Sequence, residues 1–234
     1  MSPSEDDLTF VPEHFSGRAR LFPLPNLVLF PHVIQPLHVF ERRYVEMFLD
    51  AVEDDRLIAM SLLEPGWESD YDGRPPLAPV ACLGRVITWQ AQGSSRYNLL
   101  LLGMQRVKIV RELPPDRSFR EAEVELLADC YPPETETLRL ALHTKLLETF
   151  QRLMPNLKDA EELFSQLSLE NVTLGTLTDV ISYALDLGLP LKQGLLSEAC
   201  VDRRATMLIS HLDQTKSEPS AVGAGAFPPG FSEN

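Results

Sequence analysis

The side chains best suited to metal binding in this sequence are two histidines, His32 and His38, which flank a segment expected to be extended. Imidazole nitrogens bind zinc and related metals, but a stable site needs three or four ligands. No third ligand lies close to this pair in the sequence, so we interpret both histidines as polar residues at the edge of a strand. We predict no metal site and no cofactor.

Residue patterns for catalysis are also missing. Adjacent carboxylates occur at Glu161-Glu162 and Asp54-Asp55, but neighbouring side chains in a helix or turn point in different directions, which favours solvated carboxylates over an acid–base pair. No lysine follows a serine by three residues, and the signatures of phosphate loops, nucleophile elbows, zinc hydrolases and dinucleotide-binding folds are absent. We predict no catalytic residue, with a serine–lysine pair assembled by the fold left open.

Four aromatic side chains are the best candidates for contact with a partner: Trp67, Tyr71, Trp89 and Tyr97. The first two lie in a long loop, residues 65–79, and the other two bracket the tip of an expected hairpin. Exposed aromatic residues are common anchors for protein partners, so we take these four as candidate polypeptide-binding residues. The alternative for Trp89 and Tyr97 is that they only pair across two strands.

Composition limits the class of partner. The chain has 234 residues and a formal net charge of −13, and its arginines are scattered, so nucleic acid and anionic membranes are disfavoured as partners. The three cysteines, Cys82, Cys130 and Cys200, form no CxxC pair and are predicted to be reduced, buried thiols. The N-terminus lacks a secretory pattern and the longest apolar run is short, so we expect a soluble, cytoplasmic protein.

The elements that position these residues change in type along the chain. Segments rich in β-branched and large apolar residues, separated by Pro, Gly, Ser or Asp, predict strands at residues 19–24, 27–29, 56–63, 80–91, 96–102, 105–112 and 119–127. Gly103 is expected to allow a sharp reversal between the strands at residues 96–102 and 105–112. Apolar residues spaced by three and four predict one helix over residues 41–54.

After Pro132-Pro133 the period changes to that of helices. Helices are predicted at residues 134–153, 159–167, 174–187 and 202–212, with a short one opened by Pro190. Gly188 is placed as the glycine that ends the third of them. The predicted fold class is therefore α+β, with a β-rich domain at residues 19–130, a helical bundle at 131–213, and disordered tails at 1–18 and 214–234.

Residues 21–48, LFPLPNLVLFPHVIQPLHVFERRYVEMF, resemble the opening of the N-terminal domain of Lon proteases. The resemblance continues through CLGRVITW (82–89), LLLLGMQRVKIVRE (99–112) and REAEVELLAD (120–129), and covers roughly residues 19–213. His32 stands where the family usually has glycine, and GSSRYN replaces the usual turn at the hairpin. The resemblance implies a PUA-like β pseudo-barrel with one crossing helix, followed by helices.

The same resemblance implies a protein-recognition module that binds unfolded or extended polypeptide. We expect it to stand alone and to be non-catalytic, because the ATPase and peptidase parts of Lon proteases have no counterpart in the sequence. The main alternative is an adaptor that docks on a folded partner, such as a protease or chaperone, through the helices or through Phe227 and Phe231. Small-ligand binding and, because of the PUA-like likeness, RNA binding are weaker alternatives; the acidic charge argues against RNA.

Overall fold

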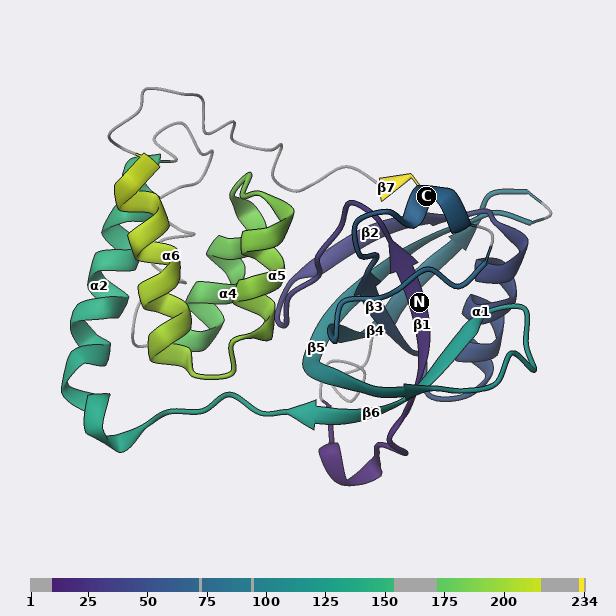
Figure 1. Cartoon of the computed structure of the whole chain (residues 1–234), viewed down its shortest axis with the longest axis horizontal. Coiled ribbons are helices and arrows are strands. Elements are labelled where there is room, and N and C mark those ends of the chain that lie inside the picture. The colour runs from purple at the N-terminus through teal and green to yellow at the C-terminus, as the bar shows by residue number, and fades with distance from the viewer. Residues whose placement is uncertain (1–9, 72, 94, 154–171, 216–231, 234) are drawn as a thin grey trace. The chain divides into compact units, whose positions relative to one another are not determined.

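A computed structural model of the chain describes residues 10–71, 73–93, 95–153, 172–215 and 232–233. The chain divides between Leu127 and Ala128 into two compact units, and residues 232–233 belong to the first unit. Strands dominate the first unit and helices form the second, so the predicted α+β class is confirmed (Figure 1). The helix expected at 159–167, Phe227 and Phe231 lie outside the described residues.

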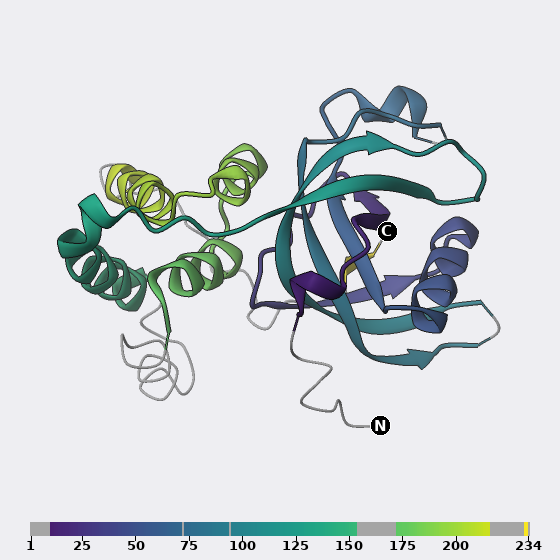
Figure 2. The ribbon, with the colours of Figure 1, turned by 90° about the horizontal axis from the view of Figure 1, so that it is seen from below.

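Five strands of the first unit close into a barrel: β1 (Arg18–Leu24), β3 (Leu57–Leu62), β4 (Val80–Ala91), β5 (Tyr97–Glu112) and β6 (Arg120–Leu127). They pair in the order β4-β3-β1-β6-β5, and β5 pairs back with β4, which closes the ring (Figure 2). Only β1 and β3 run parallel within this ring. A further strand, β2 (Ile34–Val39), lies outside the barrel and pairs antiparallel with the first part of β5.

The interior of the barrel is filled by small and medium apolar side chains. Alternate residues of each strand point inward. They form one buried cluster: Ala19, Leu21, Leu57, Ala59, Ala81, Leu83, Val107, Ala122 and Val124. A barrel of few strands has a narrow interior, which explains why alanine recurs on four of the five strands that build it.

Helix α1 (Arg42–Glu53) covers the outer face of β1 and β3. It buries Tyr44, Met47, Phe48 and Ala51, which recur at spacings of three and four, as expected for one face of an amphipathic helix. The ring centroids of Tyr44 and of Phe22 on β1 lie 4.5 Å apart. Arg20 forms ion pairs with three aspartates at the end of the helix, Asp50 at 2.5 Å, Asp54 at 2.8 Å and Asp55 at 2.7 Å, so Asp54 and Asp55 are not merely solvated.

The reversal predicted at Gly103 is wrong. β5 runs unbroken through this residue, and a Cβ atom there would collide with the carbonyl oxygen of Phe30. The neighbouring chain makes two backbone hydrogen bonds with the glycine, from His32 N to Gly103 O and from Gly103 N to Val33 O, both 2.8 Å. The glycine is therefore needed for a close approach between two chain segments and not for a turn.

Two further predictions in this region need correction. Residues 27–29 form no strand; Val28 and Leu29 are buried between prolines without joining the sheet. Directly afterwards, His32 has φ +67°, a left-handed conformation that favours glycine. This local geometry would suit the glycine that the resemblance to Lon N-terminal domains implies at this place.

The second unit contains four described helices: α2 (Glu136–Leu153), α4 (Leu174–Ala184), α5 (Leu189–Ser197) and α6 (Val201–Thr215). Their buried faces meet through residues such as Leu146, Phe150, Ile181 and Leu208. Helix α4 ends three residues earlier than predicted, at Ala184. Gly188 is the N-cap of α5, with φ −58°, and not a C-terminal glycine, whereas Pro190 opens α5 as predicted.

Candidate functional site

Trp67 and Tyr71 lie together in the loop between β3 and β4. A short 3₁₀ helix, Trp67–Asp70, brings their rings into an edge-on contact with centroids 5.5 Å apart. The Tyr71 hydroxyl donates a hydrogen bond of 2.7 Å to the carboxylate of Glu41, just before α1. The guanidinium of Arg43 lies 4.8 Å from the centroid of the Tyr71 ring. These contacts fix the loop on the first turn of α1.

Burial and the hydrogen bond to Glu41 together raise the pKa of Tyr71. The phenol therefore stays neutral and continues to donate its proton to the carboxylate at physiological pH. Both aromatic side chains are half-buried, so each retains an exposed surface beside α1.

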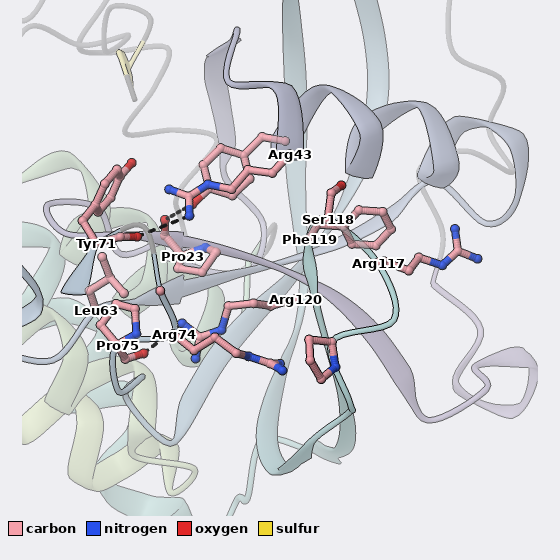
Figure 3. A pocket seen from close by; sticks show the side chains of 13 residues that line it. Pro23, Arg43, Leu63, Tyr71, Arg74, Pro75, Arg117, Ser118, Phe119 and Arg120 are labelled. Atoms are coloured by element: carbon pink, nitrogen blue, oxygen red, sulfur yellow. Dashed lines mark hydrogen bonds between the residues drawn. The ribbon is translucent and has the colours of Figure 1, made fainter.

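A pocket of about 210 Å³ opens beside this loop (Figure 3). Its walls come from the first turn of α1, from the loop after β3 and from the segment that precedes β6. Four arginines line it: Arg43, Arg74, Arg117 and Arg120. Pockets that enclose small-molecule ligands are usually larger, about 300–1,000 Å³, so the volume suits a single side chain better than a cofactor.

Carboxylates hold these arginines in place. Arg120 binds Glu112 through both Nε, at 2.9 Å, and Nη2, at 2.5 Å, and Arg74 Nη2 binds the same carboxylate at 2.8 Å. Burial would raise the pKa of Glu112, but the hydrogen bonds and charges of Arg120 and Arg74 outweigh burial and hold it below its usual value. Arg117 binds Asp50 near the end of α1. The pocket wall is thus preorganised and rich in donors.

Trp89 and Tyr97 sit at the other predicted place, the hairpin between β4 and β5. They are not directly opposite each other: Trp89 pairs with Leu99, and Tyr97 pairs with Ala91. Both rings instead pack on Phe48 of α1, with centroid distances of 6.0 Å for Trp89 and 4.8 Å for Tyr97. The two residues are therefore diagonal neighbours on one face of the hairpin and not a directly opposite pair.

The four predicted residues thus form two pairs on α1. Trp67 and Tyr71 lie at its first turn, while Trp89 and Tyr97 pack at its middle. Among the described residues, no ring contact joins the two pairs. Trp89 is 40% exposed, so it remains accessible to a partner.

Strand β2 is a functional candidate that the sequence reasoning did not identify. Residues 32–38 were expected to be extended, but no strand was assigned there. One side of β2 pairs with β5 over six residue pairs, from Ile34↔Leu102 to Val39↔Tyr97. Its other side pairs, in parallel, with the chain's own β7, Ser232–Glu233, at Leu37 and His38. Pro36 was the available signal, because proline within a strand indicates an edge.

Two exposed side chains of β2 and its C-terminal end are apolar. Ile34 is 45% exposed and Phe40, directly after the strand, is 38% exposed. His38 lies between them; its Nδ1 is 2.6 Å from Asn98 Oδ1 of β5, and its ring is 5.7 Å from that of Phe40. An outer strand with apolar side chains suits contact with an extended chain.

A metal-binding cluster and a membrane-spanning helix are both absent from the described residues. No three His, Cys, Asp or Glu side chains gather there in a way that would hold a metal ion. None of the helices in the described part of the chain is long and apolar enough to cross a membrane.

Comparisons with family models and with known sequences both identify Lon proteases. The family model of the ATP-dependent protease La (LON) substrate-binding domain matches residues 18–214. The chain is 28% identical over 199 residues to the Lon protease of Anaeromyxobacter dehalogenans and 28% identical over 200 residues to Lon protease 2 of Myxococcus xanthus, covering 84% of this chain in each case. It spans 23% of the length of each of these relatives.

Solved structures show the same fold. The N-terminal domain of the Mycobacterium avium complex Lon protease aligns with a TM-score of 0.65 at 16% identity, covering 84% of this chain and 98% of that one. A Lon N-terminal domain protein from Xanthomonas campestris aligns with a TM-score of 0.58 at 21% identity, covering 82% of this chain and 97% of that one. The β-barrel followed by helices is therefore the architecture of these N-terminal domains.

Proposed function

The chain belongs to the family of ATP-dependent protease La (LON) substrate-binding domains, and we propose that it binds unfolded or extended polypeptide without catalysing a reaction. The family description concerns substrate binding and fits a recognition role. The arginine-lined pocket, whose charged groups are all arginines held by carboxylates, fits binding better than acid–base catalysis.

The observation that carries this proposal is the pairing of β2 with β7. Two residues from the end of the chain, Ser232 and Glu233, add to β2 as a short parallel strand. An edge that accepts a strand from its own chain has the backbone geometry to accept one from another extended chain. Main-chain hydrogen bonds then supply affinity for any sequence, and side-chain contacts supply selectivity.

The aromatic pairs and the pocket supply such side-chain contacts. Trp67, Tyr71 and Trp89 offer rigid apolar surface at a low cost in side-chain entropy. The pocket has space for one side chain, and its guanidinium groups favour an acidic one. The bound polypeptide in this proposal is extended, partly apolar and without a fixed fold.

Fluorescence anisotropy with one labelled polypeptide, offered both folded and permanently unfolded, tests the proposal. We expect binding of the unfolded form only. Ile34→Lys places a charge on the exposed face of β2 and should weaken binding about tenfold, or about 1.4 kcal/mol. Val110→Lys is the matched control, because Val110 is 52% exposed on a part of β5 that does not pair with β2. Equal binding of both forms, or equal effects of both lysines, would refute the proposal.

Truncation after Gln214 tests the edge separately. Removing Ser232 and Glu233 removes the strand that occupies Leu37 and His38, so affinity for the unfolded polypeptide should rise severalfold. A truncated chain that binds no more tightly than the full chain would place the site elsewhere.

A second function, docking on a folded partner such as a protease or chaperone, is supported by a groove of about 680 Å³ in the helical unit. Leu138 of α2 and Met207 of α6 line it and are 56% and 38% exposed. Leu138→Glu should abolish binding to a purified folded partner of this kind while leaving binding of unfolded polypeptide unchanged. If Leu138→Glu instead abolished binding of unfolded polypeptide and left binding of the folded partner unchanged, the groove would be favoured as a polypeptide site.

A further inference from the structure

Cys130 and Cys200 are 70 positions apart in the sequence but form a backbone pair in the helical unit. Cys130 N donates a 2.9 Å hydrogen bond to Ala199 O, and Val201 N donates a 3.0 Å hydrogen bond to Cys130 O. This is the hydrogen-bond pattern of an isolated parallel bridge with the two cysteines as partners. Paired residues of neighbouring strands direct their side chains to the same face.

The spacing of such a bridge suits a disulfide. Neighbouring strands lie about 4.8 Å apart. Disulfides join residues whose Cα atoms are about 4.4–6.8 Å apart. Both cysteines are free thiols, and the third cysteine, Cys82, is buried in the β-rich unit.

The two thiols differ in access. Cys130 is exposed, contrary to the prediction that the cysteines are buried, whereas Cys200 is 8% exposed. The pKa of Arg203 is raised mainly by the hydrogen bond and the charge of Glu198, and to a smaller degree by Cys200 and Cys130, so its guanidinium acts electrostatically on both cysteines. An exposed thiol beside a second, shielded thiol is the arrangement of an attacking cysteine and a resolving cysteine.

We propose that Cys130 and Cys200 are a peroxide-sensitive thiol pair that closes reversibly into an intramolecular disulfide. The Cys130 thiolate attacks one oxygen of hydrogen peroxide; the O–O bond breaks, water leaves after protonation, and Cys130 becomes a sulfenic acid. The Cys200 thiolate then attacks the Cys130 sulfur, the S–O bond breaks, and a second water leaves. Two thiols lose two electrons and two protons, and the peroxide is reduced to two waters.

The disulfide would fasten the start of α6 to the segment that follows β6. The local structure already restrains Cys200, because its backbone N donates a 2.7 Å hydrogen bond to Glu198 Oε1 and the next residue begins α6. Closing the loop of residues 131–199 lowers the entropy of the unfolded chain, so oxidation should raise Tm by roughly 5–10 °C. A dithiol reductant should reverse this shift.

The test treats the full chain with hydrogen peroxide and counts thiols after denaturation. We expect the count to fall from three to one, with a single cross-linked peptide pair containing Cys130 and Cys200 under non-reducing conditions. Cys130→Ser changes an exposed residue and should keep the fold, as checked by circular dichroism, but lose both the cross-link and the rise in Tm. Cys200→Ser should lose the cross-link and leave Cys130 open to over-oxidation.

Three results would overturn the proposal. The first is retention of all three thiols under peroxide that oxidises an unstructured cysteine peptide. The second is a cross-link between two chains. The third is sulfinic acid at Cys130 with an intact thiol at Cys200. None of these readouts depends on polypeptide binding, so the thiol pair and the proposed function stand or fall separately.

Discussion

Arg204 of α6 binds Asp129 through two parallel hydrogen bonds, from Nη1 to Oδ1 at 3.0 Å and from Nη2 to Oδ2 at 2.8 Å. The arginine side chain is completely buried, and its Nε lies 3.3 Å from Asp179, which is also completely buried. One guanidinium thus neutralises two carboxylates from distant parts of the helical unit. Such a cluster ties α4, α6 and the chain before α2 into one structure.

Arg204→Met should lower the free energy of unfolding by about 3–5 kcal/mol, because the completely buried Asp179 and the partly buried Asp129 would lose their shared counter-charge. Urea unfolding followed by circular dichroism measures the loss. The adjacent Arg203→Met is the control: its side chain is 72% exposed, so a change within about 0.5 kcal/mol is expected. Similar losses for the two variants would contradict the role assigned to the buried cluster.

Trp67→Ala should weaken binding of unfolded polypeptide about tenfold without unfolding the chain, because a half-buried aromatic anchor is removed from the loop beside α1. Anisotropy titration gives the affinity and thermal melting gives the stability. Tyr71→Phe keeps the ring but loses the hydrogen bond to Glu41, and it should bind nearly as well as the parent chain. An unchanged affinity for Trp67→Ala would remove this loop from the binding surface.

His32→Gly should stabilise the chain by about 0.5 kcal/mol, because glycine adopts a positive φ without the steric cost that histidine has there. The gain is partly offset by the greater freedom of glycine in the unfolded state. His32→Ala keeps the steric cost and should give no gain. A lower Tm for His32→Gly than for His32→Ala would show that the histidine side chain itself stabilises the bend.

Glu112 should make stability depend on pH in the acidic range. Arg120 and Arg74 bind its charged form and lower its pKa, so the stabilisation is present above the usual glutamate pKa and is lost as pH falls through the lowered value. Glu112→Gln should cost about 1–2 kcal/mol at pH 7 and little at pH 3. Glu123→Gln, in an exposed pair with Arg111, should change stability little at either pH. If the free energy of unfolding changed with pH equally in the parent chain and in Glu112→Gln, this role of Glu112 would be contradicted.

Local patterns predicted most of the elements, and long-range contacts explain the errors. β4 matches its predicted bounds, Val80–Ala91, because turn residues flank it on both sides. Gly103 was misread because a glycine that permits close approach and a glycine that permits a turn look the same in sequence; the difference is the Phe30 carbonyl, far along the chain. β2 was missed because Gln35, a polar residue, is buried and Ile34 is exposed, which reverses the usual alternation.

The candidate site was predicted only in part, for the same reason. Trp67 and Tyr71 stood out as aromatic residues in a long loop, and their mutual contact follows from a spacing of four residues. The four pocket arginines come from three separated segments, and no spacing relates them. Cys130 and Cys200 likewise become neighbours only through the packing of the helical unit. A single sequence holds no pattern that would reveal such pairs.

The alanines inside the barrel limit which amino-acid substitutions the chain can accept. Ala19 and Ala122 are directly paired across β1 and β6, and Ala59 and Ala81 are equally buried on β3 and β4, so larger side chains at these places would force strands apart. Saturation mutagenesis scored by soluble expression should therefore separate two classes of position, one that tolerates few substitutions and one that tolerates many. These four positions would accept almost nothing but alanine, glycine or serine, while exposed positions such as Val110 would accept most residues. Substitutions that change what the chain binds are therefore confined to its outer surface, because the barrel interior tolerates little change.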